Sequence, residues 1–226
     1  MPSKRSVTAT RSCKICHRKI ERNSFFSMVF TPKSICLRCF LALKPTYFFW
    51  KEHGVSFLAI YPYQETYQNL LYLYKGCGDI ELAPCFLERI AFALRLRFRG
   101  YRIVYAPSHP SKVLERGFEH IPPMFECLKL PILHAFVKTQ DIKQSDQSKS
   151  QRKKIGKYLK LADERGIKGQ KILLVDDVFT TGSTMRACIS LLQEKHPKRI
   201  HVLVLSKVPK PSRSAKAHIG HADRRA

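Results

Sequence analysis

The apolar positions of the chain fall into short continuous runs and into longer stretches with helical spacing. Short runs of this kind are typical of strands that are buried on both faces of a parallel sheet. The runs that predict strands lie at 102–106, 132–137, 171–175 and 199–205. Helical spacing predicts helices at 82–98, 122–130 and 183–195. Residues 69–74 fit either a strand or a short helix. The alternation predicts an α/β domain with a mostly parallel sheet.

Several segments lack either pattern. Residues 139–155 are polar without periodicity, which predicts a mobile loop. The aromatic-rich stretches PTYFFW and YPYQETY predict a connector that packs two modules together. The chain ends are polar and basic, and we expect them to be disordered. The sequence therefore divides into a disordered N-terminus, a small cysteine-rich module, a connector, an α/β domain and a basic disordered tail, at 1–12, 13–43, 44–68, 69–206 and 207–226.

The stretch with the clearest chemistry is residues 172–184, ILLVDDVFTTGST. An apolar run ends in Asp176 and Asp177, and a hydroxyl-rich turn then leads into a predicted helix. A strand, a turn and a helix in this order leave unpaired backbone N–H groups and the helix dipole directed at one spot, which favours a phosphate. The two acids could accept hydrogen bonds from sugar hydroxyls, so the stretch predicts a ribose-5-phosphate site. The turn residues are Thr180, Thr181, Gly182, Ser183 and Thr184.

At these residues the chain resembles the type I phosphoribosyltransferases, whose signature is an apolar strand, two acids and a TTG-containing turn. The resemblance implies that Asp176 and Asp177 hold the ribose 2- and 3-hydroxyls of phosphoribosyl diphosphate (PRPP). It also implies that turn 180–184 holds the 5-phosphate. The structural alternative is a buried strand followed by a Thr or Ser helix cap, with both acids solvated. A Walker-type nucleotide loop is excluded because no GK[ST] follows the turn.

Cysteines mark a second candidate site. Two C-x2-C pairs, Cys13 with Cys16 and Cys36 with Cys39, have the spacing of a zinc ribbon. Such pairs place four thiolates around one tetrahedral ion. A module too small to hold a hydrophobic core needs a metal site of this kind for its stability. We therefore expect structural zinc. Disulfides, a dithiol redox motif and the replacement of one thiolate by His17 are the alternatives. The remaining cysteines share no ligand spacing and are expected to be small buried residues, namely Cys77, Cys85, Cys127 and Cys188.

Two further segments, YKGCGD at 74–79 and SHPSKVLERGF at 108–118, resemble the ComF/GntX family. That family joins a CxxC…CxxC zinc ribbon to a phosphoribosyltransferase-type domain. The resemblance implies that Ser108 and Arg116 face the diphosphate of PRPP, and the fork of an arginine suits that group. Arg116 could instead form a surface ion pair with a neighbouring glutamate. Lys75 could reach the diphosphate as well, or could be an exposed lysine in a turn.

The net charge of the chain bears on whether it binds nucleic acid. The net charge of +24, from 41 Lys and Arg against 17 Asp and Glu, is either simple solvation or a surface that attracts nucleic acid by counterion release. Segment 149–157 is our favoured contact for single-stranded DNA. No run of about 18 uncharged apolar residues is present, so no membrane span is expected. The N-terminus lacks the apolar core of a secretory signal, and a cytoplasmic location is expected.

The resemblance to the ComF/GntX family implies a PRPP-binding competence factor that assists the uptake of transforming single-stranded DNA. Other competence proteins, such as a DNA-uptake helicase, are the implied protein partners, and Mg²⁺ would accompany the diphosphate. If the chain catalyses transfer, Asp176 and Asp177 would stabilise positive charge at the anomeric carbon. No side chain is an evident general base for an acceptor. The alternatives are a nucleobase-salvage phosphoribosyltransferase and a non-catalytic module that binds PRPP and DNA.

Overall fold

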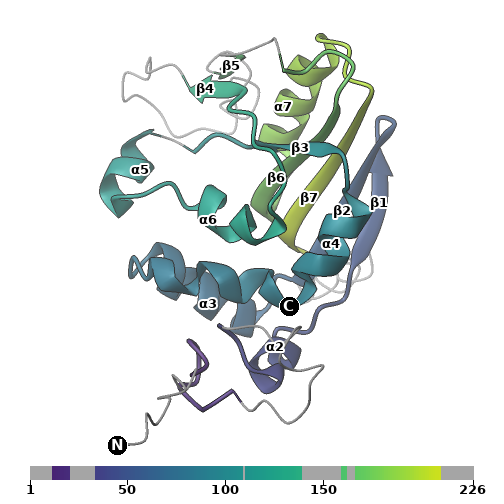
Figure 1. The fold of residues 1–226 in the computed structure, drawn as a ribbon. Helices are drawn as coiled ribbons and strands as arrows, with labels where there is room; N and C mark the ends of the chain where they lie inside the picture. Colours follow the sequence, from purple (N-terminus) through teal and green to yellow (C-terminus); the bar gives the residue numbers. More distant parts are fainter. Residues whose placement is uncertain (1–11, 21–33, 109, 139–158, 162–165, 210–226) are drawn as a thin grey trace, which may run out of the picture.

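The largest feature of the computed structural model is a five-stranded sheet of order β1-β2-β7-β6-β3 (Figure 1). The structure describes residues 12–20, 34–108, 110–138, 159–161 and 166–209. The strands are β1 (Phe48–Glu52), β2 (Val55–Pro62), β3 (Tyr101–Tyr105), β6 (Lys171–Phe179) and β7 (Arg199–Lys207). All neighbours in the sheet are parallel except β1, which pairs with β2 as an antiparallel edge strand. The expected α/β class with a mostly parallel sheet is confirmed.

β6 lies between β3 and β7, and the apolar residues at 172–175 are fully buried there. The sequence places the end of this strand at Val175, and that boundary is wrong. β6 continues to Phe179 because β7 is long enough to pair with it, with Asp176 opposite Val204 and Val178 opposite Ser206. Both acids therefore lie inside the strand.

Helical segments flank the sheet in chain order. α3 (Glu65–Lys75) follows β2, and α7 (Ser183–Gln193) connects β6 to β7. Between α3 and β3 lie η1 (Ile80–Phe86), η2 (Glu88–Ile90) and α4 (Ala91–Arg97); between β3 and β4 lie α5 (Pro110–Arg116), α6 (Ile121–Phe125) and η3 (Glu126–Leu128). α6 packs against both η1 and β6. Within the described residues, no helix combines the length and the apolar character needed to cross a membrane.

The segment 44–68 is not a connector. It contains β1 and β2, and α3 begins at Glu65. β2 lies between β1 and β7 in the sheet and is buried along almost its whole length. The aromatic residues that suggested a linker between modules instead pack within the main domain, where Trp50 stacks on Phe57 with ring centroids 5.0 Å apart.

Several other predicted helices and strands differ from those in the structure. Residues 69–74 are helical, within α3. The predicted helix at 82–98 is broken into η1, η2 and α4, with Pro84 inside the first 3-10 turn. The predicted strand at 132–137 joins the main sheet only through an isolated parallel bridge between Ile132 and Ile103 of β3. β4 (Phe136–Lys138) pairs with β5 (Leu159–Leu161) in a separate two-stranded sheet. The predicted loop 139–155, the segment 149–157 and most of both chain ends lie outside the described residues.

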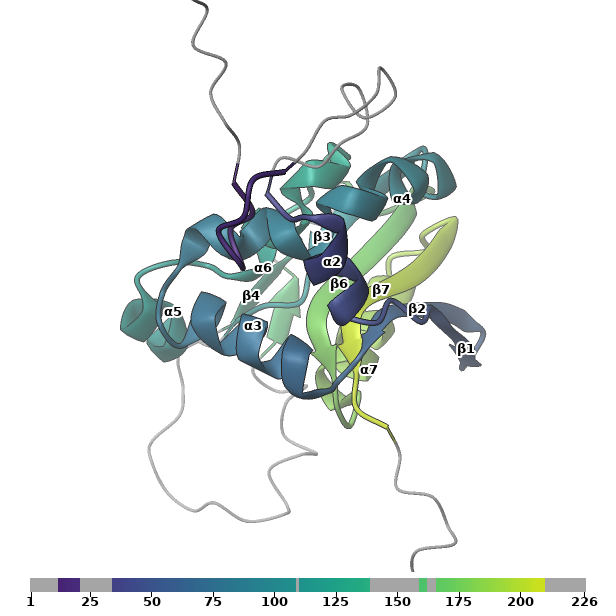
Figure 2. The same cartoon turned by 90° about the horizontal axis from the view of Figure 1, so that it is seen from below.

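The N-terminal module packs against the η1–η2 segment of the main domain. The backbone N–H of Ser34 donates to Glu88 Oε2 at 2.9 Å, and Arg89 lies over the ring of Phe40 at 5.7 Å. Lys14 forms an ion pair with Glu81. α2 (Leu37–Ala42) carries the second cysteine pair and lies in front of the sheet domain when the molecule is seen from below (Figure 2). The module is thereby fixed to the α/β domain.

Candidate functional site

A cavity of 290 Å³ lies where β6 ends and α7 begins, lined by Asp176 and residues 178–185. The N-cap of α7 is Gly182, in the left-handed region with φ 72°, and no side chain caps the helix. The alternative of a Thr or Ser helix cap is therefore wrong. The hydroxyls of Thr181 and Ser183 lie 3.1 Å apart in this turn. Uncapped N–H groups at the start of a helix, together with two hydroxyls, suit a phosphate.

The turn requires a glycine and is supported by the β1–β2 hairpin. A Cβ at position 182 would lie 2.5 Å from the ring of Phe179, which itself packs edge-on against Trp50 at 5.2 Å. Arg186 donates to the carbonyl oxygen of Thr181 and, at 3.2 Å, to Glu52 of β1. The segment that the sequence presents as a connector thus holds the predicted phosphate turn in place.

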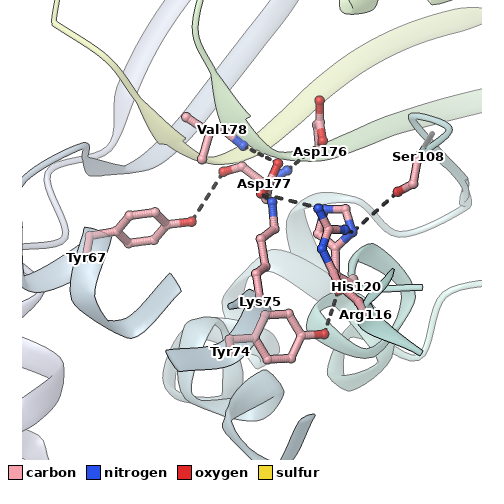
Figure 3. Close-up of polar contacts among 9 residues, drawn as sticks. All are labelled: Tyr67, Tyr74, Lys75, Ser108, Arg116, His120, Asp176, Asp177 and Val178. Carbon is pink, nitrogen blue, oxygen red and sulfur yellow. Dashed lines mark hydrogen bonds and ion pairs between the residues drawn. The ribbon is translucent and has the colours of Figure 1, made fainter. Parts of the chain in front are cut away.

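The two acids lie in different surroundings, because successive residues of a strand face opposite sides of the sheet. Asp176 lines the cavity of the turn. Asp177 is buried, with 7% of its surface exposed. Its Oδ1 accepts from the backbone N–H of Val178 at 2.8 Å, and its Oδ2 forms an ion pair with Lys75 (Figure 3). The alternative in which both acids are solvated is therefore wrong for Asp177.

A larger cavity of 800 Å³ adjoins the first one. The two cavities share Val178 and Thr180 in their linings. Three cationic side chains line the larger cavity, namely Lys75, Lys112 and Arg116. Burial lowers the pKa of Lys75 to about 8; the carboxylate of Asp176 opposes this shift, and the charges of Arg116 and Lys112 add to it. Lys75 is therefore still largely protonated at neutral pH, and the cavity suits a polyanion.

Helix α3 organises the floor of this cavity. Its buried face carries Tyr67 and Tyr74 at a spacing of seven residues, which places them on one side of the helix. The hydroxyl of Tyr67 donates to the carbonyl oxygen of Asp177 at 3.3 Å, and that of Tyr74 donates to the carbonyl oxygen of His120 at 2.6 Å. Burial raises the pKa of both tyrosines, so both remain neutral donors. With Lys75, one helix makes three polar contacts to the site.

His120 is a site residue that sequence reasoning missed. It is 5% exposed and lies at the start of α6. Its Nδ1 is 2.8 Å from a guanidinium nitrogen of Arg116 and 3.3 Å from Ser108 Oγ, and its Nε2 is 3.7 Å from Asp177 Oδ2. Figure 3 shows this histidine between Asp177 and the loop that carries Ser108. No motif in the sequence singles it out; only its place two residues after the segment ending at Phe118 would have drawn attention to it.

The structure therefore brings three sequence-predicted residues together with Asp177. Lys75 pairs with Asp177 directly, whereas Ser108 and Arg116 contact His120, which also lies beside Asp177. Arg116 contacts His120. The alternative interpretation, a surface ion pair with a glutamate, does not predict this contact. Lys75 is not an exposed turn residue: it ends α3, and 21% of its side chain is exposed.

The four N-terminal cysteines form one cluster in which the sulfur atoms lie within 4.8 Å of one another. The Sγ atoms of Cys16 and Cys36 are 3.8 Å apart, which matches the edge of about 3.8 Å of a tetrahedron with Zn–S bonds of about 2.3 Å. The backbone N–H of Cys39 donates to Cys36 Sγ at 3.4 Å. All four are free thiols and not disulfides. Exposed His17 is not among the cluster's ligands in the described chain.

The thiols of the cluster differ in how readily they ionise: burial and the neighbouring thiols raise the pKa of Cys39 well above its usual value. Burial opposes ionisation of the Cys13 thiol, but hydrogen bonds from the backbone of Cys36, Cys16 and Ile15 outweigh it and lower the pKa of Cys13 to about 7. Thiolates are the form that binds zinc. The residues present therefore fit a structural zinc ion. Cys13 and Cys16 lie in a turn closed by pairing of Ser12 with Lys19, whereas Cys36 and Cys39 lie at the start of α2.

Comparison with known proteins agrees with these features. The model of the phosphoribosyl transferase domain matches residues 116–220. The competence protein ComFC of Streptococcus pneumoniae (strain ATCC BAA-255 / R6) is 29% identical over 67% of this chain and 68% of its own length. ComFC of Bacillus subtilis (strain 168) is 27% identical over 61% of this chain, and the match spans 58% of that relative.

Among solved structures, a hypoxanthine-guanine phosphoribosyltransferase (hpt-2) from Bacillus anthracis str. 'Ames Ancestor' is similar, with 18% identity and a TM-score of 0.39 over 58% of this chain and 72% of that one. A superposition this loose says nothing about the activity of the chain.

The parallel sheet, the strand–turn–helix site and the match to the domain model define a phosphoribosyltransferase-type α/β domain with a four-cysteine module at its N-terminal side. More specifically, the match to the domain model and the likeness to two proteins named ComFC support a ComF-like type I phosphoribosyltransferase domain.

Proposed function

We propose that the chain binds PRPP across its two adjoining cavities. The observation that carries this proposal is the contact between a small cavity with hydroxyl and N–H donors and a larger cationic cavity, with the acids of β6 at their boundary. PRPP has a matching order of groups, with a phosphate, a ribose and a diphosphate. A single phosphate would need only the first cavity.

Each part of the site then has a role. The hydroxyls of Thr181 and Ser183 and the N-terminus of α7 hold the 5-phosphate. Asp176 accepts hydrogen bonds from ribose hydroxyls. Asp177 adds a second carboxylate to the sugar side of the site, on the other face of the strand. Arg116, with Lys75 and Ser108, binds the diphosphate through charge-assisted hydrogen bonds, which are the stronger kind.

Magnesium fits this arrangement because it takes oxygen ligands and is usually held by substrate phosphates with one or two carboxylates. When bound, it would neutralise charge on the diphosphate. If ribosyl transfer occurs, the carboxylate of Asp176 stabilises positive charge as it develops at the anomeric carbon. Ser108 and Arg116 would orient the diphosphate as leaving group.

For the cellular role, we propose a competence factor of the cytoplasm that handles transforming single-stranded DNA with other competence proteins, such as a DNA-uptake helicase. The support is the likeness to two proteins named ComFC and the net charge of +24. A positive excess of this size attracts phosphate polymers by counterion release.

A nucleobase-salvage phosphoribosyltransferase is the second candidate. It is favoured by a further cavity of 380 Å³ that is lined by Ser108 and by the rings of Tyr105, His134 and Phe136. Rings of this kind suit a planar base. Ribosyl transfer from PRPP to free bases, followed by chromatography, distinguishes this candidate from the competence factor.

Calorimetric titration of PRPP tests the central proposal. In the variant Thr181→Ala with Ser183→Ala, two donors to the 5-phosphate are lost, so PRPP affinity should fall about tenfold or more. Ser190→Ala is the matched control, because Ser190 is an exposed hydroxyl on the same helix away from the cavity. Unchanged PRPP affinity in the double variant, with an intact circular dichroism spectrum, would rule out the phosphate turn as the binding site.

A further inference from the structure

His120 contacts both sides of the candidate PRPP site. Arg116 and Ser108 approach its Nδ1 from the diphosphate side, at 2.8 and 3.3 Å. Asp177 lies on its other side, with Oδ2 3.7 Å from Nε2. The backbone of His120 is held by Tyr74, whose hydroxyl is itself buried. Figure 3 shows the imidazole ring of His120 between Asp177 and Ser108.

The contacts define the tautomer of the ring. A guanidinium can only donate hydrogen bonds, so Nδ1 of His120 must accept from Arg116. The ring proton of a neutral imidazole then lies on Nε2, which faces Asp177. Burial, together with the charges of Lys75 and Arg116, lowers the pKa of His120 to about 2. The ring is therefore neutral at physiological pH.

Nδ1 of a neutral imidazole has one lone pair, but two donors are within its reach. Arg116 is the nearer one, and the hydroxyl of Ser108 is the other. Arg116 carries further N–H groups, so it can keep its hydrogen bond to Nδ1 while those groups bind an anion. The ring then keeps its tautomer, and its Nε2–H continues to face Asp177. Arg116 is thus free to bind a ligand without disturbing the carboxylate.

We infer that His120 is a positioning residue that keeps Arg116 and Asp177 aligned, so that one ligand can contact the diphosphate side and the sugar side at the same time. The inference rests on the proposed binding of PRPP. It concerns ligands that carry both a diphosphate and a ribose. A fragment that reaches only one side needs no such alignment.

Two substitutions separate positioning from simple packing. His120→Phe keeps a ring in the pocket but removes both polar contacts. His120→Gln retains an acceptor for Arg116 and a donor for Asp177. Calorimetry should be carried out with PRPP, inorganic diphosphate and ribose 5-phosphate for the wild type and both variants.

His120→Phe should weaken PRPP binding about tenfold, as expected for the loss of one hydrogen-bonded network, while each fragment binds within about twofold of the wild type. His120→Gln should bind PRPP within about threefold of the wild type. Equal losses for PRPP and both fragments would show a structural role only and overturn the inference. PRPP binding by folded His120→Phe at the wild-type affinity would overturn it as well. A wild type that binds no PRPP would end the proposed function and this inference together.

A measurement on the wild-type protein keeps the inference testable if His120→Phe does not fold. Nitrogen-15 NMR of the imidazole should show the neutral Nε2–H tautomer from pH 7 down to pH 5, both without ligand and with inorganic diphosphate. The groups that face the ring are Lys75 of α3, Arg116 of α5, Asp177 of β6 and Ser108. An Nδ1–H tautomer, or a protonated ring at pH 6, would contradict the arrangement whatever the protein binds.

Discussion

Asp176 and Asp177 are neighbours in the sequence but not in their surroundings. Placing a carboxylate in the interior costs several kcal/mol unless a partner compensates for the lost hydration, and Lys75 is that partner for Asp177. Asp176 lines the cavity of the phosphate turn and accepts from the backbone N–H of Asp177 at 2.9 Å. Since a strand alternates its faces, the two acids have mostly different neighbours, although the charge of Asp176 also acts on Lys75.

The two acids should therefore respond differently to amidation. Asp177→Asn leaves Lys75 without its carboxylate in a largely buried place and should lower the free energy of unfolding by about 1–3 kcal/mol. Asp176→Asn should change the free energy of unfolding by less than about 1 kcal/mol but weaken PRPP much more than inorganic phosphate. Urea unfolding and calorimetry give these quantities. Equal loss of stability in both variants would contradict the separation of their roles.

How much of the site the sequence could predict depends on how local each contact is. The stretch 172–184 is contiguous, so strand, acids and turn could be recognised together. His120 and Tyr67 could not, because their partners lie elsewhere in the chain: Tyr67 donates to Asp177, 110 residues away. The packing of α3 and α6 against β6 brings these groups together.

At the level of elements, the same reasoning explains the error at 44–68. The apolar run of β2 was hidden among aromatic residues, and aromatic residues are as common in strands as in packed linkers. The long-range pairing with β7 decides the matter, and local pattern cannot reveal it. The pairing of β1 and β2 also matters for the site. Trp50 and Glu52 of β1 contact Phe179 and Arg186, which lie beside the turn.

The four-cysteine module is an element whose stability should depend on its metal. Cys36→Ser removes one ligand, so the purified reduced protein should lose its zinc, of which the wild type is expected to hold about one ion per chain. Residues 13–43 should then unfold at a lower temperature than the sheet. PRPP affinity should stay within about threefold, because the module contacts η1 and η2 and not β6 or the turn in the described residues.

Elemental analysis and limited proteolysis measure the two effects. Cys77→Ser is the control, because Cys77 is an exposed thiol outside the cluster and should leave the zinc content unchanged. Wild-type protein without zinc, purified under reducing conditions, would overturn the assignment. A Cys36→Ser variant that binds PRPP no longer would show that the module supports the site as well as its own fold.

At the scale of the whole molecule, the charge exceeds what the site uses. Among the described residues, the cationic ones that line the larger cavity are Lys75, Lys112 and Arg116, whereas the chain has 41 Lys and Arg. A net charge of +24 destabilises a compact state by self-repulsion and is therefore costly if it serves solubility alone. Two basic segments outside the described residues contribute to the excess, namely 149–157 and 210–226.

The last prediction uses these segments to distinguish nucleic-acid binding from solvation. The wild type should bind single-stranded DNA without strong sequence preference, and log affinity should fall linearly with log salt by about 0.7 per phosphate contacted. Removal of residues 210–226, which include Lys210, Arg213, Lys216, Arg224 and Arg225, should make this slope less steep and leave PRPP affinity unchanged. Neutralising Arg152, Lys153 and Lys154 should weaken DNA binding, because segment 149–157 is the favoured contact for single-stranded DNA. Fluorescence anisotropy at several salt concentrations measures the slope. If neither change alters DNA binding at physiological salt, the charge serves solvation, and the salvage enzyme becomes the better proposal.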